Sequence, residues 1–260
     1  MESLIRFSFF MGTFVLMGLW ELWKPKLKLN NLRRIRWPQN IAIILFNTAL
    51  MTTFMWLIPL KDVLYSSSFG LWSMLSVPLW AQIIVSIVVF DLVIYSQHRV
   101  FHRSPLLWNI HMVHHVDHDY DLTTALRFHP IEIFISLGVK LITIFLLGAP
   151  FEAVIIFEIV LNSAAMFNHG NIELPNRVDH LLRNVIVTPD MHRIHHSVVS
   201  NETNSNYGFN IPFWDYLFGT YCHVSKSDPI QVGLPNYQSG KRQMFLWLIG
   251  LPFFKRKINK

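Results

Sequence analysis

Histidines are the residues in this chain best suited to do chemistry. There are 13 of them, and none occurs before residue 98. Eight form three clusters with helical spacing, HRVFH at 98–102, HMVHH at 111–115 and HRIHH at 192–196. Because residues three and four apart share one face of a helix, each cluster would direct its imidazoles toward a common point. This arrangement is the one that a bound metal requires.

Two of the clusters end in adjacent histidines, which suggests a pair of ions. Adjacent residues diverge by about 100° around a helix, so one helix can serve two neighbouring metals. A ninth candidate, His169, comes where a long apolar stretch ends. The candidate ligands are His98, His102, His111, His114, His115, His169, His192, His195 and His196.

Other polar residues are expected near these ligands. Asp91 shares a helix face with His98, and Glu158 and Asn162 share one with His169, so they could orient the ligands through hydrogen bonds. They could equally be polar residues that pack helices together. His129 lies at the start of the apolar stretch, and we expect it beside either the ligands or the substrate. Three histidines fit no cluster and are expected at the surface: His118, His180 and His223.

Ligand type and number narrow the choice of metal. Imidazole suits Zn, Cu, Fe and Ni alike. A zinc site uses three or four protein ligands, fewer than the histidines present, and no H-E-x-x-H motif occurs. Cys222 is the single cysteine, so one chain cannot build a disulfide or a Cys-based metal site. Two irons that keep a position open for O2 fit best.

The composition predicts a membrane protein. Of the 260 residues, 52% are hydrophobic and 15% are charged, against about 25% charged in soluble domains. Apolar stretches near the length of a bilayer span occur at 4–23, 40–60 and 71–97. A fourth, 131–168, is broken at 148–150 by Gly-Ala-Pro and predicts a helical hairpin. We therefore expect an all-α integral membrane bundle.

Basic residues indicate its orientation. Six Lys and Arg lie between residues 24 and 36, which the positive-inside rule places in the cytoplasm. The loop around Lys61 and Asp62 then lies outside. Counting spans from there brings both histidine-rich stretches, 98–129 and 169–196, to the cytoplasmic face as a di-metal helical cap. The net charge of +6 is explained by basic residues near anionic headgroups, without nucleic acid.

No internal repeat or low-complexity tract divides the chain. We expect transmembrane helices over 1–97, a histidine-rich catalytic region over 98–240 that includes the hairpin 131–168, and an interfacial basic and apolar tail over 241–260.

The series HRVFH, HMVHH, HPIE, FNHG, TPDMHRIHH and FWDYLFGT resembles the fatty acid hydroxylase/sterol desaturase superfamily over about residues 90–222. The resemblance implies a membrane di-iron oxygenase with the nine histidines as ligands. Fatty acid 2-hydroxylases have a further histidine where this chain has Ala165. This difference brings the chain closer to the alkylglycerol monooxygenase-like and bacterial branches, and implies a bacterial inner membrane.

The expected activity is O2-dependent hydroxylation of an acyl, alkyl-ether or sterol-type lipid. Two alternatives stay open: a desaturase on the same di-iron site, and a non-enzymatic metal transporter or sensor. The sequence has no G-x-G-x-x-G fingerprint, haem motif or cysteine cluster. A separate electron donor is therefore implied, such as a cytochrome b5, a ferredoxin or a reduced pterin.

Overall fold

The computed structural model describes residues 1–29, 33–57, 69–226, 230–237 and 243–254. Within these ranges all regular structure is helical, apart from two isolated β-bridges. The all-α prediction is therefore confirmed. The long helices are α1 (Glu2–Trp23), α2 (Arg33–Leu57), α4 (Leu79–Arg103), α6 (Pro130–Leu147) and α7 (Phe151–Asn168). The short α-helices are α5 (Pro105–His115), α8 (Asn176–Leu182), α9 (Pro189–His195), α10 (Ser200–Thr203), α11 (Phe213–Leu217) and α12 (Phe245–Gly250). The 3-10 helices are η1 (Leu71–Met74), η2 (Leu122–Leu126), η3 (Pro235–Tyr237) and η5 (Leu251–Phe253).

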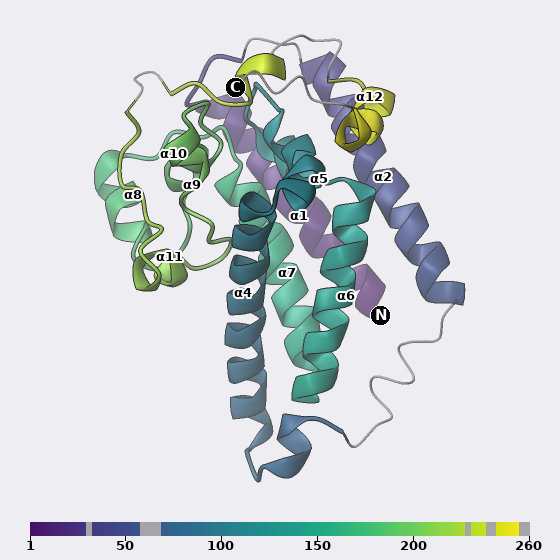
Figure 1. Ribbon diagram of the computed structural model, residues 1–260. Helices are drawn as coiled ribbons and strands as arrows, with labels where there is room; N and C mark the ends of the chain where they lie inside the picture. Colours follow the sequence, from purple (N-terminus) through teal and green to yellow (C-terminus); the bar gives the residue numbers. More distant parts are fainter. Residues whose placement is uncertain (30–32, 58–68, 227–229, 238–242, 255–260) are drawn as a thin grey trace.

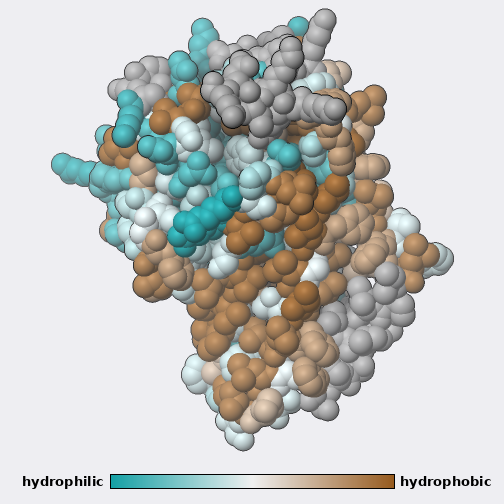
Figure 2. Space-filling model, viewed as in Figure 1, coloured by the Kyte–Doolittle hydropathy of each residue, from teal (hydrophilic) through white to brown (hydrophobic). Residues whose placement is uncertain are grey.

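The five long helices are each long and apolar enough to cross a membrane. In Figure 2, hydrophobic side chains cover the lengths of α4 and α6. Hydrophilic side chains gather at one end of the bundle, over α8, α9 and α10. This division suggests a multi-pass membrane protein with a polar cap. The loop predicted around Lys61 and Asp62 lies outside the described residues.

The third apolar stretch differs from its predicted bounds of 71–97. Its first residues form η1, and α4 begins only at Leu79, after Pro78 at the N-cap. Proline suits a helix start because its missing N–H would be unsatisfied there anyway. The helix then continues to Arg103 and carries His98 and His102 in its last turns. The boundary predicted at residue 98 thus falls within one continuous helix.

The hairpin of α6 and α7 is confirmed. Gly148 ends α6 in the left-handed conformation, with a φ of 65°. A side chain there would place its Cβ 2.9 Å from the carbonyl oxygen of Phe69, and one at Gly70 would approach the Gly148 nitrogen to 2.3 Å. Two glycines are therefore needed where the hairpin turn meets the start of η1.

Helix α7 lies at the centre of the bundle. It packs against α1 through a buried cluster that includes Met17 and Met166, and against α4 through Phe90 and Phe157, whose rings lie 5.3 Å apart. Figure 1 shows that α1, α4 and α7 end, and α2 and α6 begin, at the same end of the bundle. This arrangement brings the histidine-bearing segments together, as the count of spans predicted.

Two sets of contacts attach the cap to the bundle. Arg36 of α2 donates to both carboxylate oxygens of Asp117 at 2.7 and 2.9 Å and to Asp121 at 2.8 Å. Burial alone would raise the pKa of Asp117, but Arg36 and Arg127 hold it well below its usual range. The C-terminal segment packs on α2 and α5 through Leu248. The predicted tail is described only for residues 243–254.

Candidate metal centre

The nine predicted histidines converge in two groups, and all nine are buried. Within each group, one ring nitrogen from every residue lies within 4.8 Å of the others. The first group is His98, His102, His111, His115 and His195. The second group is His114, His169, His192 and His196. Each group has enough imidazoles for one metal ion.

The adjacent histidines separate between the two groups, as helix geometry predicted. His115 belongs to the first group and His114 to the second, with ring centroids 5.4 Å apart. His195 and His196 divide in the same way, also at 5.4 Å. The two groups are therefore neighbours that share α5 and the end of α9.

Local start signals fix the rotation of both short helices. Ser104 caps α5 and Pro105 follows it, and the Ser104 hydroxyl accepts the backbone N–H of Leu107. Thr188 and Pro189 start α9 in the same way. A side-chain cap followed by proline at the first helical position sets where a helix begins. In a helix as short as α9, the starting residue decides which way each histidine points.

The hydrogen bonds of three histidines fix where their protons lie. His98, His169 and His195 each place Nδ1 2.7 to 2.8 Å from a backbone carbonyl. A carbonyl can only accept, so Nδ1 carries the proton and Nε2 of the neutral ring carries a lone pair. The acceptors are the carbonyls of Tyr207, Ala165 and Ser205. Metal-binding histidines are usually oriented by such bonds from the other ring nitrogen.

The ring nitrogens that face inward fit a cation. Nε2 of His169 lies 3.0 Å from Nε2 of His114 and 3.2 Å from that of His192. His115 and His196 have no hydrogen-bond partner for either ring nitrogen among the described residues. Burying so many polar atoms without partners is costly. A metal ion bound to each group would satisfy these lone pairs.

Burial also keeps the imidazoles in their metal-binding form. It lowers the pKa of His169 to about 4 and that of His195 to about 3. The charged form is disfavoured because it loses its hydration. Burial, followed by the neighbouring histidines, also lowers the pKa of His114, His115, His192 and His196 well below the ordinary value. Neutral imidazole is the form that coordinates a metal.

Asp91 supports the centre indirectly. Its carboxylate accepts from Asn210 at 2.7 Å and from the Trp214 indole at 2.8 Å. These bonds hold the segment whose Ser205 and Tyr207 carbonyls orient the ligands. Asp91 does not itself hydrogen-bond to any of the nine histidines in the described part of the chain. It therefore acts one step further from the centre than predicted.

Glu158 has other partners than those expected. Its carboxylate forms ion pairs with Arg6, at 3.0 Å, and with Lys140. Glu158 precedes His169 by 11 residues, which is about 16 Å along a helix. The two residues share a helix face but lie at different positions along the helix axis. Asn162 donates to the backbone carbonyl of Glu158. In the described part of the chain, neither side chain hydrogen-bonds to any of the nine histidines.

The remaining histidines divide between interior and surface. His129 caps α6 and its Nε2 lies 3.1 Å from the carbonyl of Ile249, so it ties the C-terminal segment to the hairpin. The prediction that His118 lies at the surface is wrong, because it is buried beside Gln243 at 3.0 Å. His180 and His223 are exposed, as expected.

Glu132 is the residue that the sequence analysis missed. Its Oε1 lies 2.7 Å from Nδ1 of His111, and the side chain is buried. It therefore does for His111 what the backbone carbonyls do for other ligands. The available signal was an acidic residue in the first turn of an apolar helix, three residues after His129.

A cavity of about 550 Å3 reaches the first group from within the bundle. Helices α2, α4, α6 and α7 form its walls, and both His98 and His111 line it. Most of its lining surface is apolar, with isolated polar groups that include Asn47 and Gln97. Its volume and composition are typical of a site for a small molecule.

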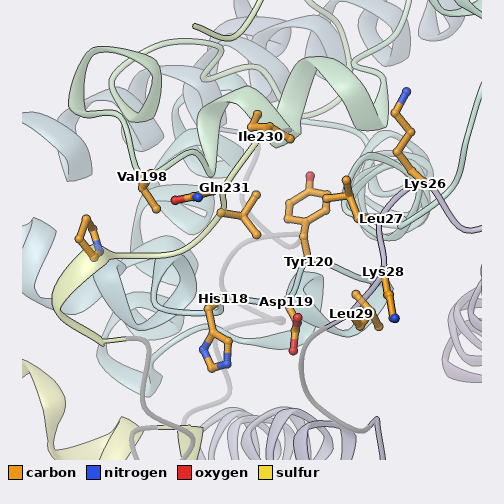
Figure 3. Close-up of a pocket in the computed structure, with 12 residues that line it drawn as sticks. Lys26, Leu27, Lys28, Leu29, His118, Asp119, Tyr120, Val198, Ile230 and Gln231 are labelled. Atoms are coloured by element: carbon orange, nitrogen blue, oxygen red, sulfur yellow. The ribbon is translucent and has the colours of Figure 1, made fainter. Parts of the chain in front are cut away.

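A second cavity approaches the centre from the polar cap. Figure 3 shows Lys26 and Lys28 on one side of it, Val198 on the other and Tyr120 between them. The Tyr120 ring lies 5.1 Å from the ring of His196 and 5.5 Å from that of His169. One side chain therefore separates this cavity from the second histidine group.

Comparison with known proteins agrees with this site. A family model described as fatty acid hydroxylase matches residues 83–220, a little over half of the chain. An ornithine lipid hydroxylase of Rhizobium tropici is 30% identical over 69% of this chain and 52% of its own. An alkylglycerol monooxygenase of Caenorhabditis elegans is 28% identical over 60% of this chain and 30% of its own. A fatty acid hydroxylase of Lecanicillium sp is 28% identical over 64% of this chain and 47% of its own.

The chain therefore spans about half or less of the length of these relatives. No solved structure gives a significant match. The matched region begins within α4 and ends after α11, so it contains all nine converging histidines together with Glu132. On this match, the chain belongs to the fatty acid hydroxylase family.

Proposed function

We propose that the protein is a membrane-bound, di-iron, O2-dependent oxidoreductase that hydroxylates a lipid. The observation that carries this proposal is the cavity that reaches His98 and His111 from within the apolar bundle. A lipid can enter such a cavity without leaving the bilayer. Three relatives whose names specify lipid or alkylglycerol oxidation support the same chemistry.

In this proposal the two histidine groups hold one iron each. Imidazole donors alone also suit zinc and copper, so the choice of iron rests on the family. When bound, the irons supply the chemistry that activates O2 toward a C–H bond. The protein supplies the rest: Glu132 and the backbone carbonyls orient the rings. Apolar side chains such as Ile94 and Leu161 form a cavity wall that excludes water.

Hydroxylation is preferred to desaturation, although both begin with removal of hydrogen from a carbon. The product distinguishes them, because a hydroxylase adds one oxygen atom and a desaturase removes two hydrogens. A metal transporter is a third possibility from the sequence. It would take up metal without consuming O2, so the same assay separates it from both enzymes.

We further propose that the histidine end faces the cytoplasm of a bacterial inner membrane. Lys24, Lys26 and Lys28 follow α1 at that end, in agreement with the positive-inside rule. The electron donor, a redox protein such as a cytochrome b5 or ferredoxin, or a reduced pterin, would then act from the cytoplasm. We place it at the cavity beside Tyr120, because Tyr120 contacts the second histidine group.

The direct test uses the full chain purified in lipid nanodiscs and loaded with iron. We expect about two irons per chain, and O2 uptake that depends on added lipid and on a reductant. Lipid mass spectrometry of cells with and without the protein should show a species that has gained one oxygen atom. His114→Ala should abolish that species, whereas His180→Ala, at an exposed histidine, should preserve it. A chain that holds one zinc and consumes no O2 would contradict the proposal.

A further inference from the structure

One residue that lines the cavity carries a buried hydrogen-bond acceptor whose orientation is fixed. Asn47 of α2 is buried, and its Nδ2 donates to the backbone carbonyl of Phe128 at 2.8 Å. That carbonyl can only accept, so the amide cannot be rotated without losing the bond. The Asn47 Oδ1 is therefore held in place, and it has no hydrogen-bond partner among the described residues.

Glu132 lines the same cavity and carries a second buried acceptor. Its Oε1 takes the Nδ1 proton of His111, and its Oε2 is buried without a hydrogen-bond partner in the described chain. Because His111 also lines the cavity, this oxygen lies beside the first histidine group. A ligand that reaches Oε2 is therefore close to the proposed reaction centre.

Gln97 of α4 adds a third polar group. Its Nε2 donates to the Ser136 hydroxyl at 2.5 Å, and its Oε1 is buried and unpartnered among the described residues. Asn47, Glu132 and Gln97 belong to three different helices, and all three line the one cavity. The unpartnered atoms are all oxygens. These three residues therefore offer buried acceptors without donors, whereas the hydroxyl groups of Thr48 and Thr52 also line the cavity.

An ordinary acyl chain would leave these oxygens unsatisfied. Burying an acceptor against hydrocarbon costs free energy, and polar side chains inside a membrane bundle usually serve a function. A ligand with an N–H or O–H group would pair with them instead. Sites built around such acceptors discriminate strongly against analogues that lack the donor.

We infer that this cavity selects a lipid with a hydrogen-bond donor, a hydroxyl, an amide N–H or an ammonium group, near the carbon that is oxidised. This inference rests on the proposed function, since it identifies the cavity as the substrate site. It excludes plain hydrocarbon and ester chains as preferred ligands. The position of Glu132 next to His111 places the donor near the proposed metal centre.

The test measures binding of lipids that differ in the donor alone. N-hexadecylacetamide and hexadecyl acetate have the same shape, but the amide carries an N–H where the ester carries an oxygen. The metal-loaded full chain in nanodiscs is titrated with each lipid under anaerobic conditions without reductant. We expect the amide to bind about tenfold more tightly, because one buried acceptor is satisfied. Equal binding of the two lipids would overturn the inference.

Variants tie the preference to the cavity wall. Asn47→Leu should reduce the preference for the amide below about twofold. Gln97→Met should also reduce this preference, and it serves as the test if Asn47→Leu folds poorly. Thr53→Val is the control, because Thr53 lies on the same helix, is exposed and bonds to its own helix at Ala49. A preference that survives both Asn47→Leu and Gln97→Met would also refute the inference.

Further lipids identify the donor. Hexadecanol is compared with its methyl ether, and hexadecylamine with both, so that hydroxyl and ammonium groups are tested separately from the amide. The binding measurement needs neither O2 nor turnover. If a donor-bearing lipid binds selectively yet gains no oxygen atom when O2 and reductant are added, the proposed function fails while the inferred ligand class stands.

Discussion

The Nε2 atoms of His98 and His111 lie 3.2 Å apart, and when both rings are neutral neither can donate a hydrogen bond to the other. The Nδ1 of His98 is held by a backbone carbonyl and that of His111 by Glu132, so both rings carry their proton on the far side. Two lone pairs therefore face one another in a buried site. A cation between them removes the repulsion, and the folded state should depend on it.

Removal of metal should lower thermal stability. A ligand that binds only the folded state stabilises it by about 4 kcal/mol when it is present at a thousand times its dissociation constant. We expect the melting temperature in nanodiscs to fall on dialysis against a chelator and to recover when iron is restored. His180→Ala should show the same dependence, because His180 is exposed and outside both groups. A melting temperature that does not change on dialysis against the chelator would argue against a metal in these groups.

The sequence predicted eight of the nine converging histidines because helical spacing carries that information locally, and His169 from the end of an apolar stretch. His111 and His115 share a face in any helix, and adjacent residues diverge in any helix. The hairpin was equally visible, because Gly148 and Pro150 interrupt an apolar run. These features depend on residues that are close in the chain, so they do not require knowledge of the tertiary structure.

The features that the sequence did not predict depend on position along a helix axis and on contacts between residues far apart in the chain. Glu158 was placed beside the ligands because it shares a face with His169, but it lies too far down the helix. His118 is buried and contacts Gln243, which is 125 residues away in the chain. Glu132 meets His111 only through the packing of α6 on α5. No local pattern encodes such pairings.

Glu132 should control how tightly the first group holds its metal. In Glu132→Ala, His111 loses the partner of its Nδ1, and removal of such a partner weakens metal binding about 10- to 100-fold. Glu132→Gln should retain most of the affinity, because its amide oxygen can still accept that proton. Competition with a graded series of chelators measures the difference. Glu152→Ala, at an exposed acid of α7, is the control, and equal affinity in all three variants would exclude this role.

Asp91 should stabilise the segment that orients the ligands. Asp91→Leu leaves the donors of Asn210 and Trp214 buried without their acceptor, at a cost of about 1–3 kcal/mol each. We expect a lower melting temperature and weaker metal retention, because the carbonyls of this segment would lose their positions. Ser96→Ala, on the exposed side of the same helix, should change neither. Unchanged metal retention would show that the segment holds itself in place.

The lysines beside Tyr120 should steer an acidic electron donor. Replacing Lys26 and Lys28 together by Gln removes two positive charges from the rim of that cavity. We expect slower turnover driven by an acidic ferredoxin, with the deficit largest at low salt, because screening weakens charge attraction. Lys24→Gln is the control, because Lys24 does not line the cavity and pairs with Glu173. An equal turnover rate for the double variant and the control would show that the electron donor does not bind at this cavity.

The single cysteine can report which side of the membrane holds the histidine end. Cys222 is partly exposed and follows α11 in the polar cap, whereas Met74 in η1 is exposed at the opposite end of the bundle. If the cap faces the cytoplasm, a membrane-impermeant maleimide should label Cys222 only after spheroplasts are permeabilised. The chain carrying Met74→Cys and Cys222→Ser should instead be labelled in intact spheroplasts. The reverse pattern would invert the orientation, because a charged reagent cannot cross the bilayer to reach a cytoplasmic thiol.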